Sequence, residues 1–234
     1  MATENVAFAK RMVERSGAGG YRGASKLESA MTPEQVQRFF TRSDGQYLFA
    51  RWGGPIVPVV FGVEDATLGV VKGAIEAVVA LAGHQMAETD PELGANLMVF
   101  FIRDWAELPV VPKLDRLVPD LGPLCARLPA AGANQYRFFR FDSDGAIKAA
   151  FVFLRMDAHL QALAAEDLAL AQAAQVICLW SDRAFADSSP LAKVHERVIL
   201  RPDVADVIRA GYAPTMPVVA RDPAHALRLA ARVG

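Results

Sequence analysis

Cysteine is scarce in this sequence, with two residues among 234, and neither belongs to a recognisable metal-binding or disulfide pattern. Cys125 and Cys178 lie far apart inside apolar stretches, where a free cysteine usually behaves as a small buried hydrophobic residue. This usage argues against a disulfide framework. The cysteines are therefore expected to be part of the core.

An excess of charge of either sign is also missing. The 25 Lys and Arg residues face 26 Asp and Glu residues, which gives a net charge of −1 and leaves the class of partner open. The segment 148–153 loosely resembles an RNA-stacking strand, but a second aromatic strand and a basic face are lacking. We expect no nucleic-acid partner, and a protein partner or a second copy of the chain stays open.

Long uninterrupted apolar runs are absent as well. The longest helix-like apolar segment, residues 66–82, contains Lys72 and Glu76, so no membrane span is expected. The N-terminus has an acidic residue in place of a basic region, and no apolar signal segment follows before Lys10. The sequence thus predicts a cytoplasmic protein, or a periplasmic one if Met1 replaces a removed signal peptide.

What the chain does have is apolar material for a core, at 53% hydrophobic residues against 22% charged. Residues 5–15 have a helical pattern that the glycine-rich stretch 17–24 ends, which predicts an N-terminal helical arm over 1–45. Thr32 and Gln35 have the spacing of a helix capping box. Residues 46–234 are expected to form a single domain.

The pattern of that domain predicts an α+β fold, in which helices pack on a mixed β-sheet and extra helices lie at both ends. Its hairpin is the clearest local signal, because two aromatic and apolar strands flank a glycine-containing turn. Val99, Phe151, Phe153 and Val176 are predicted core residues. The expected elements are strands at 56–61, 96–102, 135–141 and 146–154, and helices at 66–86, 114–128 (interrupted), 157–179, 202–210 and 222–233.

Several sequence motifs for catalysis are missing. No His-Glu-x-x-His, P-loop or Gly-x-Ser-x-Gly pattern occurs, and the four histidines include no pair at helical spacing. The glycines at 17–23 follow a helix, whereas a dinucleotide fingerprint follows a strand. Asp142–Gly145 resembles the start of a calcium loop, but its flanks are strands. We expect no metal and no cofactor.

Four short motifs suggest a family resemblance: residues 51–56 and 96–101 on the first two strands, the glutamine and Ser-Asp of 175–182, and the segments 200–204 and 208–214. With the order strand, helix, strand, hairpin, long helix, they resemble the zincin-type metalloprotease layout. They look more specifically like a bacterial family in which that layout is degenerate. The resemblance covers roughly residues 45–232.

The resemblance also implies what this chain has lost. Where that family tends to have an acidic pair three and four residues before Gln175, this chain has Ala171 and Gln172. A zincin deprotonates a metal-bound water with the glutamate between two helix histidines, so losing all three removes the mechanism. Members of the family often have export signals, from which this sequence departs. The resemblance therefore implies a non-catalytic binding or regulatory domain.

Two other functions compete with this interpretation. A small-molecule or metal-dependent enzyme could take its ligands from distant parts of the chain, with His159, Glu166, Asp182 and His195 as members. Alternatively, an assembly protein could dock its N-terminal arm on a neighbouring subunit. The candidate binding residues across these hypotheses are His159, Glu166, Gln172, Gln175, Asp182 and His195.

Overall fold

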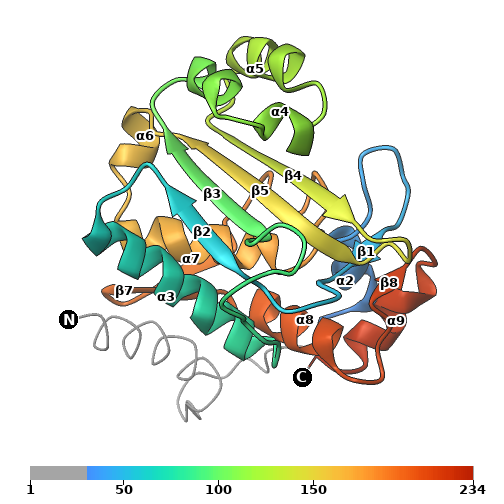
Figure 1. Ribbon diagram of the computed structural model, residues 1–234. Coiled ribbons are helices and arrows are strands. Elements are labelled where there is room, and N and C mark those ends of the chain that lie inside the picture. Colours follow the sequence, from blue (N-terminus) through green and yellow to red (C-terminus); the bar gives the residue numbers. More distant parts are fainter. Residues whose placement is uncertain (1–30, 234) are drawn as a thin grey trace.

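The computed structural model describes residues 31–233 (Figure 1). Its elements are, in chain order, α2 (Pro33–Arg38), β1 (Phe49–Ala50), β2 (Pro58–Phe61), α3 (Asp65–Leu81), β3 (Leu97–Ile102), the 3₁₀ helix η1 (Trp105–Val110), α4 (Leu114–Leu117), α5 (Leu121–Ala130), β4 (Gln135–Phe141), β5 (Ile147–Arg155), α6 (Ala158–Gln161), α7 (Ala165–Val176), β6 (Leu191–Val194), β7 (Arg197–Leu200), α8 (Pro202–Tyr212), β8 (Val219–Ala220) and α9 (Ala224–Ala230).

The largest sheet has four strands in the order β2-β3-β5-β4. Strands β2 and β5 both run parallel to β3, whereas β4 pairs antiparallel with β5 and forms one edge. The predicted mixed sheet with helices packed on it is therefore confirmed. The predicted hairpin corresponds to β4 and β5, and a register shift lies between Arg140 and Phe141.

Helices cover both faces of this sheet (Figure 1). Because side chains alternate along a strand, Leu97, Val99 and Val152 face the core that contains α3, α7 and α8. Phe100, Phe151 and neighbouring side chains face a second cluster with η1, α4 and α5. The four predicted core residues are all buried: Val99, Phe151, Phe153 and Val176.

The predicted long helix over 157–179 is wrong in its bounds. Asp157 caps the short α6 by accepting a hydrogen bond from the Leu160 amide, and the chain leaves the helical conformation before α7 begins at Ala165. At the other end, the Leu179 amide donates to the carbonyl of Ala50 at 2.8 Å. Tertiary hydrogen bonds to the β1 segment thus replace the last helical turn.

Two small sheets were not predicted. Strands β6 and β7 form an antiparallel hairpin in a stretch that reads as a polar loop, and β1 pairs with β8 near the C-terminus. The β6–β7 turn contains His195 in the left-handed conformation, at a φ of 54°. Strands of two to four residues are too short to show a clear two-residue alternation.

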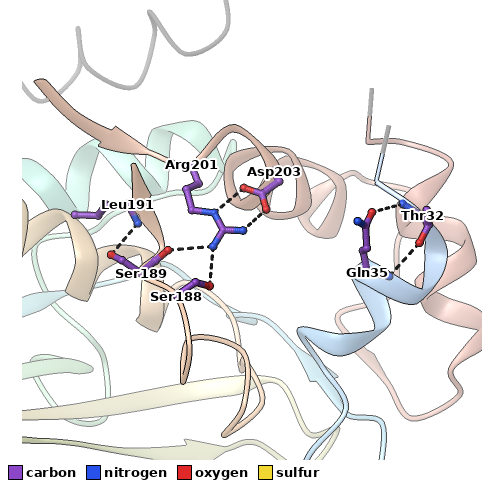
Figure 2. A network of polar contacts seen from close by, with 7 residues as sticks. All are labelled: Thr32, Gln35, Ser188, Ser189, Leu191, Arg201 and Asp203. Carbon is purple, nitrogen blue, oxygen red and sulfur yellow. Dashed lines mark hydrogen bonds and ion pairs between the residues drawn. The ribbon is translucent and has the colours of Figure 1, made fainter. Parts of the chain in front are cut away.

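The described part of the predicted arm packs into the domain. Val36, Phe39 and Phe40 belong to the main core, and α2 packs against α9. Thr32 and Gln35 form the reciprocal capping box that their spacing predicts (Figure 2). The predicted helix at 5–15 and its glycine-rich break lie outside the described residues. Between residues 31 and 233, no helix is long and apolar enough to cross a bilayer.

Candidate anion-binding site

A pocket of about 360 Å³ lies at the edge strand β4, beside the C-terminal end of α7. We call it the β4–α7 pocket. Strand β4 contributes Arg137 and Phe139, α7 contributes Gln175, and the remaining walls come from Arg42 and the segment after the helix. The residues after the helix that line it are Leu179, Trp180, Ser181, Asp182, Phe185 and Ala186.

Arg137 reaches from β4 to α7 on the inner face of the sheet. Its Nη2 donates to Oε1 of Gln172 at 2.5 Å and to Oε1 of Gln135 at 3.1 Å. The amide nitrogen of Gln172 in turn donates to the same Gln135 oxygen at 2.9 Å. These three side chains form a closed set of hydrogen bonds, which fixes the orientation of the guanidinium.

The charge of Arg137 has no carboxylate partner among residues 31–233, since both of its hydrogen-bond acceptors are neutral amides. Its Nε atom is buried and has no hydrogen-bond partner there. Burial lowers the pKa of Arg137 to about 10, so the group still carries its proton at neutral pH. A partly buried cation without a counter-ion is costly, and an incoming anion would relieve that cost.

Arg51 shows how this differs from an arginine whose environment already compensates it. Its Nε is likewise buried without a hydrogen-bond partner, but its guanidinium carbon lies 5.0 Å from the ring centroid of Tyr212. A cation over an aromatic face is stabilised by the ring's negative electrostatic potential. No such ring contact is present for Arg137 within the described chain.

The β4–α7 pocket contains two further charged residues, Arg42 and Asp182. Asp182 accepts a hydrogen bond from the Ser43 amide at 3.0 Å. Hydrogen bonds from Ser43, together with the nearby charge of Arg42, lower the pKa of the Asp182 carboxyl, which is therefore ionised. Two arginines against one aspartate leave the lining with one positive charge in excess.

The lining of the pocket also contains apolar and aromatic side chains. The rings of Trp180 and Phe185 meet edge to face with centroids 5.1 Å apart, and Phe139 is a third aromatic residue of the lining. The indole nitrogen of Trp180 donates to the carbonyl of Ala174 at 2.8 Å, which ties this wall to α7. The lining of the pocket thus combines cationic and aromatic side chains.

The loop that follows this wall is anchored by Arg201 (Figure 2). The Nη1 of Arg201 donates to the hydroxyl of Ser188 at 2.9 Å and to the carbonyl of Ser189 at 3.1 Å. The same guanidinium pairs with Asp203 at the start of α8. These contacts hold residues 188–189 against α8 and so restrain the chain that leads away from Phe185.

The predicted candidate residues separate into two groups. Gln175 and Asp182 line the pocket, and Gln172 touches it through Arg137. The other three are exposed and do not line it: His159 on α6, Glu166 in the first turn of α7 and His195 in the β6–β7 turn. In the described chain, no three His, Cys, Asp or Glu side chains gather closely enough to hold a metal ion. His159, Glu166, Asp182 and His195 therefore do not form a shared metal centre.

Arg42 and Arg137 were missed at the sequence level. The signal for Arg137 lies in the strand itself, where positions 135, 137 and 139 share one face. Because the inner face of β4 packs toward α7, a charged residue on that face is at least partly buried, as Arg137 is. Arg42 gives no such signal, since only the fold brings its loop to α7.

A second pocket of about 630 Å³ lies at the carboxyl ends of β2, β3 and β5. Its lining is mostly apolar, and its charged members, Arg103 and Glu107, are both exposed. Glu107 already accepts hydrogen bonds from the amides of Arg103 and Asp104 in a capping box. This second pocket therefore contains no buried charge that a ligand would have to neutralise.

The fold and the pocket together define a mixed-sheet protein with helices on both faces and a cationic pocket at one edge. Comparison with known proteins adds nothing to this description, because no family model, no curated protein and no solved structure matches the chain.

Proposed function

We propose that this protein is a non-catalytic binding domain with a zincin-like layout, and that its β4–α7 pocket receives an anionic ligand. The observation on which the proposal depends is Arg137, a cation whose buried Nε lacks a partner and whose only acceptors among residues 31–233 are amide oxygens. A ligand that brings a negative charge supplies the missing counter-charge.

The order β2, α3, β3, the β4–β5 hairpin and then α7 supports the zincin-like part of the proposal. In that layout α7 occupies the place of the helix that holds the catalytic groups. Here Gln172 stands where the resemblance expects an acid, and its amide is engaged by Arg137 and Gln135. A neutral amide does not accept a proton as a carboxylate does, so Gln172 cannot serve as a general base at this position of the helix.

Elemental analysis and a peptide-cleavage assay on the purified protein test the absence of proteolysis. The proposal predicts less than stoichiometric zinc, and no cleavage of an unstructured protein such as casein with or without added zinc. Stoichiometric zinc together with cleavage that a chelator abolishes would overturn it.

Thermal unfolding in the presence of simple anions tests the binding part. Acetate, phenylacetate, sulfate and inorganic phosphate are compared at constant ionic strength, so that general screening is the same in each sample. We expect at least one of them to raise the melting temperature through binding to the native state. The Arg137→Gln variant should lose this response, and Arg197→Gln on the exposed part of β7 should retain it.

A further inference from the structure

Resting on the proposed function, we infer that the β4–α7 pocket binds an organic monocarboxylate with a flat apolar body, the carboxylate at Arg137 and the body against Trp180 and Phe185. This goes beyond the binding of an anion in general, because it names the charge, the shape and the apolar part of the ligand. Each of the three follows from a different set of side chains.

The charge follows from the three ionised groups of the lining. Arg42 and Arg137 attract an anion, whereas the ionised Asp182 in the same lining repels it. One excess positive charge matches a ligand with a single negative charge. A dianion such as phosphate at slightly alkaline pH would place its second charge in the same small space as Asp182, at an electrostatic cost.

The planar shape of the ligand's charged group follows from the Arg137 donors that have no hydrogen-bond partner. Nη2 is occupied by Gln172 and Gln135, and Nη1 has no hydrogen-bond partner within residues 31–233. A guanidinium is planar and matches the planar carboxylate, with which it forms short charge-assisted hydrogen bonds. Since the two glutamines hold the plane of Arg137, the plane of a bound carboxylate is set in advance, which lowers the entropy lost on binding.

The apolar body follows from the wall. Phe139, Leu179, Trp180 and Phe185 all line the pocket, where the half-buried Phe185 meets the largely buried Trp180 edge to face. Bare inorganic anions leave such a surface in contact with water, whereas an aromatic ring buries it. A volume of about 360 Å³ suits a molecule with one ring and a short acidic arm.

Phenylacetate is the smallest probe with these features, and phenylacetamide is its neutral match in shape. Isothermal titration at pH 8 compares both with inorganic phosphate. Phenylacetate should bind at least about tenfold more tightly than either of the others.

A short peptide that ends in phenylalanine presents the same ring and carboxylate. Its free and amidated forms therefore show whether a C-terminal carboxylate also fits the pocket. Preference for the free form supports the inference.

Three variants assign the binding to the pocket. Arg137→Gln should abolish phenylacetate binding and Arg42→Gln should weaken it, while the exposed control Arg197→Gln should leave it unchanged. If Arg137→Gln does not fold, Gln172→Glu serves in its place, because the introduced carboxylate occupies Arg137 while the arginine is kept.

The outcomes separate the inference from the proposed function. If phosphate binds with Arg137 dependence and phenylacetate does not, the inference is overturned and the anion-binding function stands. If neither binds, both are overturned. Equal affinity for phenylacetate and phenylacetamide would also overturn the inference, because the carboxylate would then make no difference.

Discussion

Arg137 on β4 donates a hydrogen bond of 2.5 Å to the side-chain oxygen of Gln172 on α7, so a partly buried cation faces an amide where a carboxylate would neutralise it. The contact joins the edge strand of the sheet to the helix beneath it. It also leaves the positive charge available to a ligand. The function we propose depends on this one pairing.

Changing Gln172→Glu should close the site from within. The new carboxylate pairs with Arg137, but it gives up the hydrogen bond that the Gln172 amide nitrogen donates to Gln135, and its own desolvation offsets the attraction. We expect the free energy of unfolding at pH 7 to change by less than about 1.5 kcal/mol and the affinity for phenylacetate to fall at least about tenfold. Denaturant unfolding and calorimetric titration measure the two effects.

Gln85→Glu is the matched control, since it introduces the same charge on an exposed side chain in the loop after α3. It should change neither stability nor binding appreciably. Undiminished phenylacetate binding by a folded Gln172→Glu variant would show that Arg137 is not the anchor.

His225 should make the protein less stable in mild acid. Its ring is fully buried, and its Nδ1 shares a hydrogen bond of 2.7 Å with the Tyr47 hydroxyl. Burial, with a smaller contribution from Arg228, lowers the pKa of His225 to about 4. The unfolded chain therefore takes up this proton first as the pH falls below about 6.5, and up to about 3 kcal/mol of stability is lost on the way to pH 4.

Urea unfolding at several pH values tests this, with His225→Phe as the variant that cannot titrate. The loss of stability between pH 6.5 and pH 4 should be smaller in His225→Phe than in the natural protein. Tyr47→Phe, which removes the hydrogen bond and keeps the imidazole, should retain most of the pH dependence. The same slope in the natural protein and in His225→Phe would contradict the assignment to His225.

The two strands of the hairpin offer a test of the sheet packing. Phe151 on β5 is 0% exposed and Phe141 on β4 is 42% exposed. Phe151→Ala should therefore lower the free energy of unfolding by about 3–5 kcal/mol. Phe141→Ala should cost well under half of that, because water already reaches the ring. Equal costs, measured by chemical denaturation, would argue against the strand faces described above.

Alanine substitutions at two glycines with positive φ distinguish the cost of backbone strain from the cost of steric crowding. Gly62 and Gly45 have φ values of 82° and 83°, so alanine is disfavoured at both. A Cβ at Gly62 would lie 2.1 Å from the carbonyl oxygen of Phe101, whereas a Cβ at Gly45 would meet nothing within 4 Å. Gly62→Ala should lower the melting temperature much more than Gly45→Ala, and equal shifts would contradict the close approach of β2 and β3.

Sequence patterns predicted the elements whose signal is local. The β4–β5 hairpin follows from alternation around a glycine turn, and the cap at Thr32 follows from its spacing to Gln35. The end of α7 could not be predicted in this way, because it depends on a hydrogen bond from Leu179 to Ala50, far away in the sequence.

The site was predictable only in part, for the same reason. Gln172, Gln175 and Asp182 were candidates through their place on and after one helix, whereas His159, Glu166 and His195 were chosen by residue type and stand apart from the pocket. Arg42 enters the site because the loop before β1 is held beside the segment after α7 by the Ser43–Asp182 hydrogen bond. Residue types along a chain do not reveal such a long-range tertiary contact.

The most direct test of the central claim is to observe the Arg137 guanidinium itself. A proton–nitrogen correlation spectrum of the arginine Nε–H groups is recorded during titration with phenylacetate, and the Arg137 signal is assigned by its absence from Arg137→Lys. We predict that this signal moves in a saturable way while that of Arg197 stays in place. An Arg137 signal that remains unchanged at saturating phenylacetate would contradict the account.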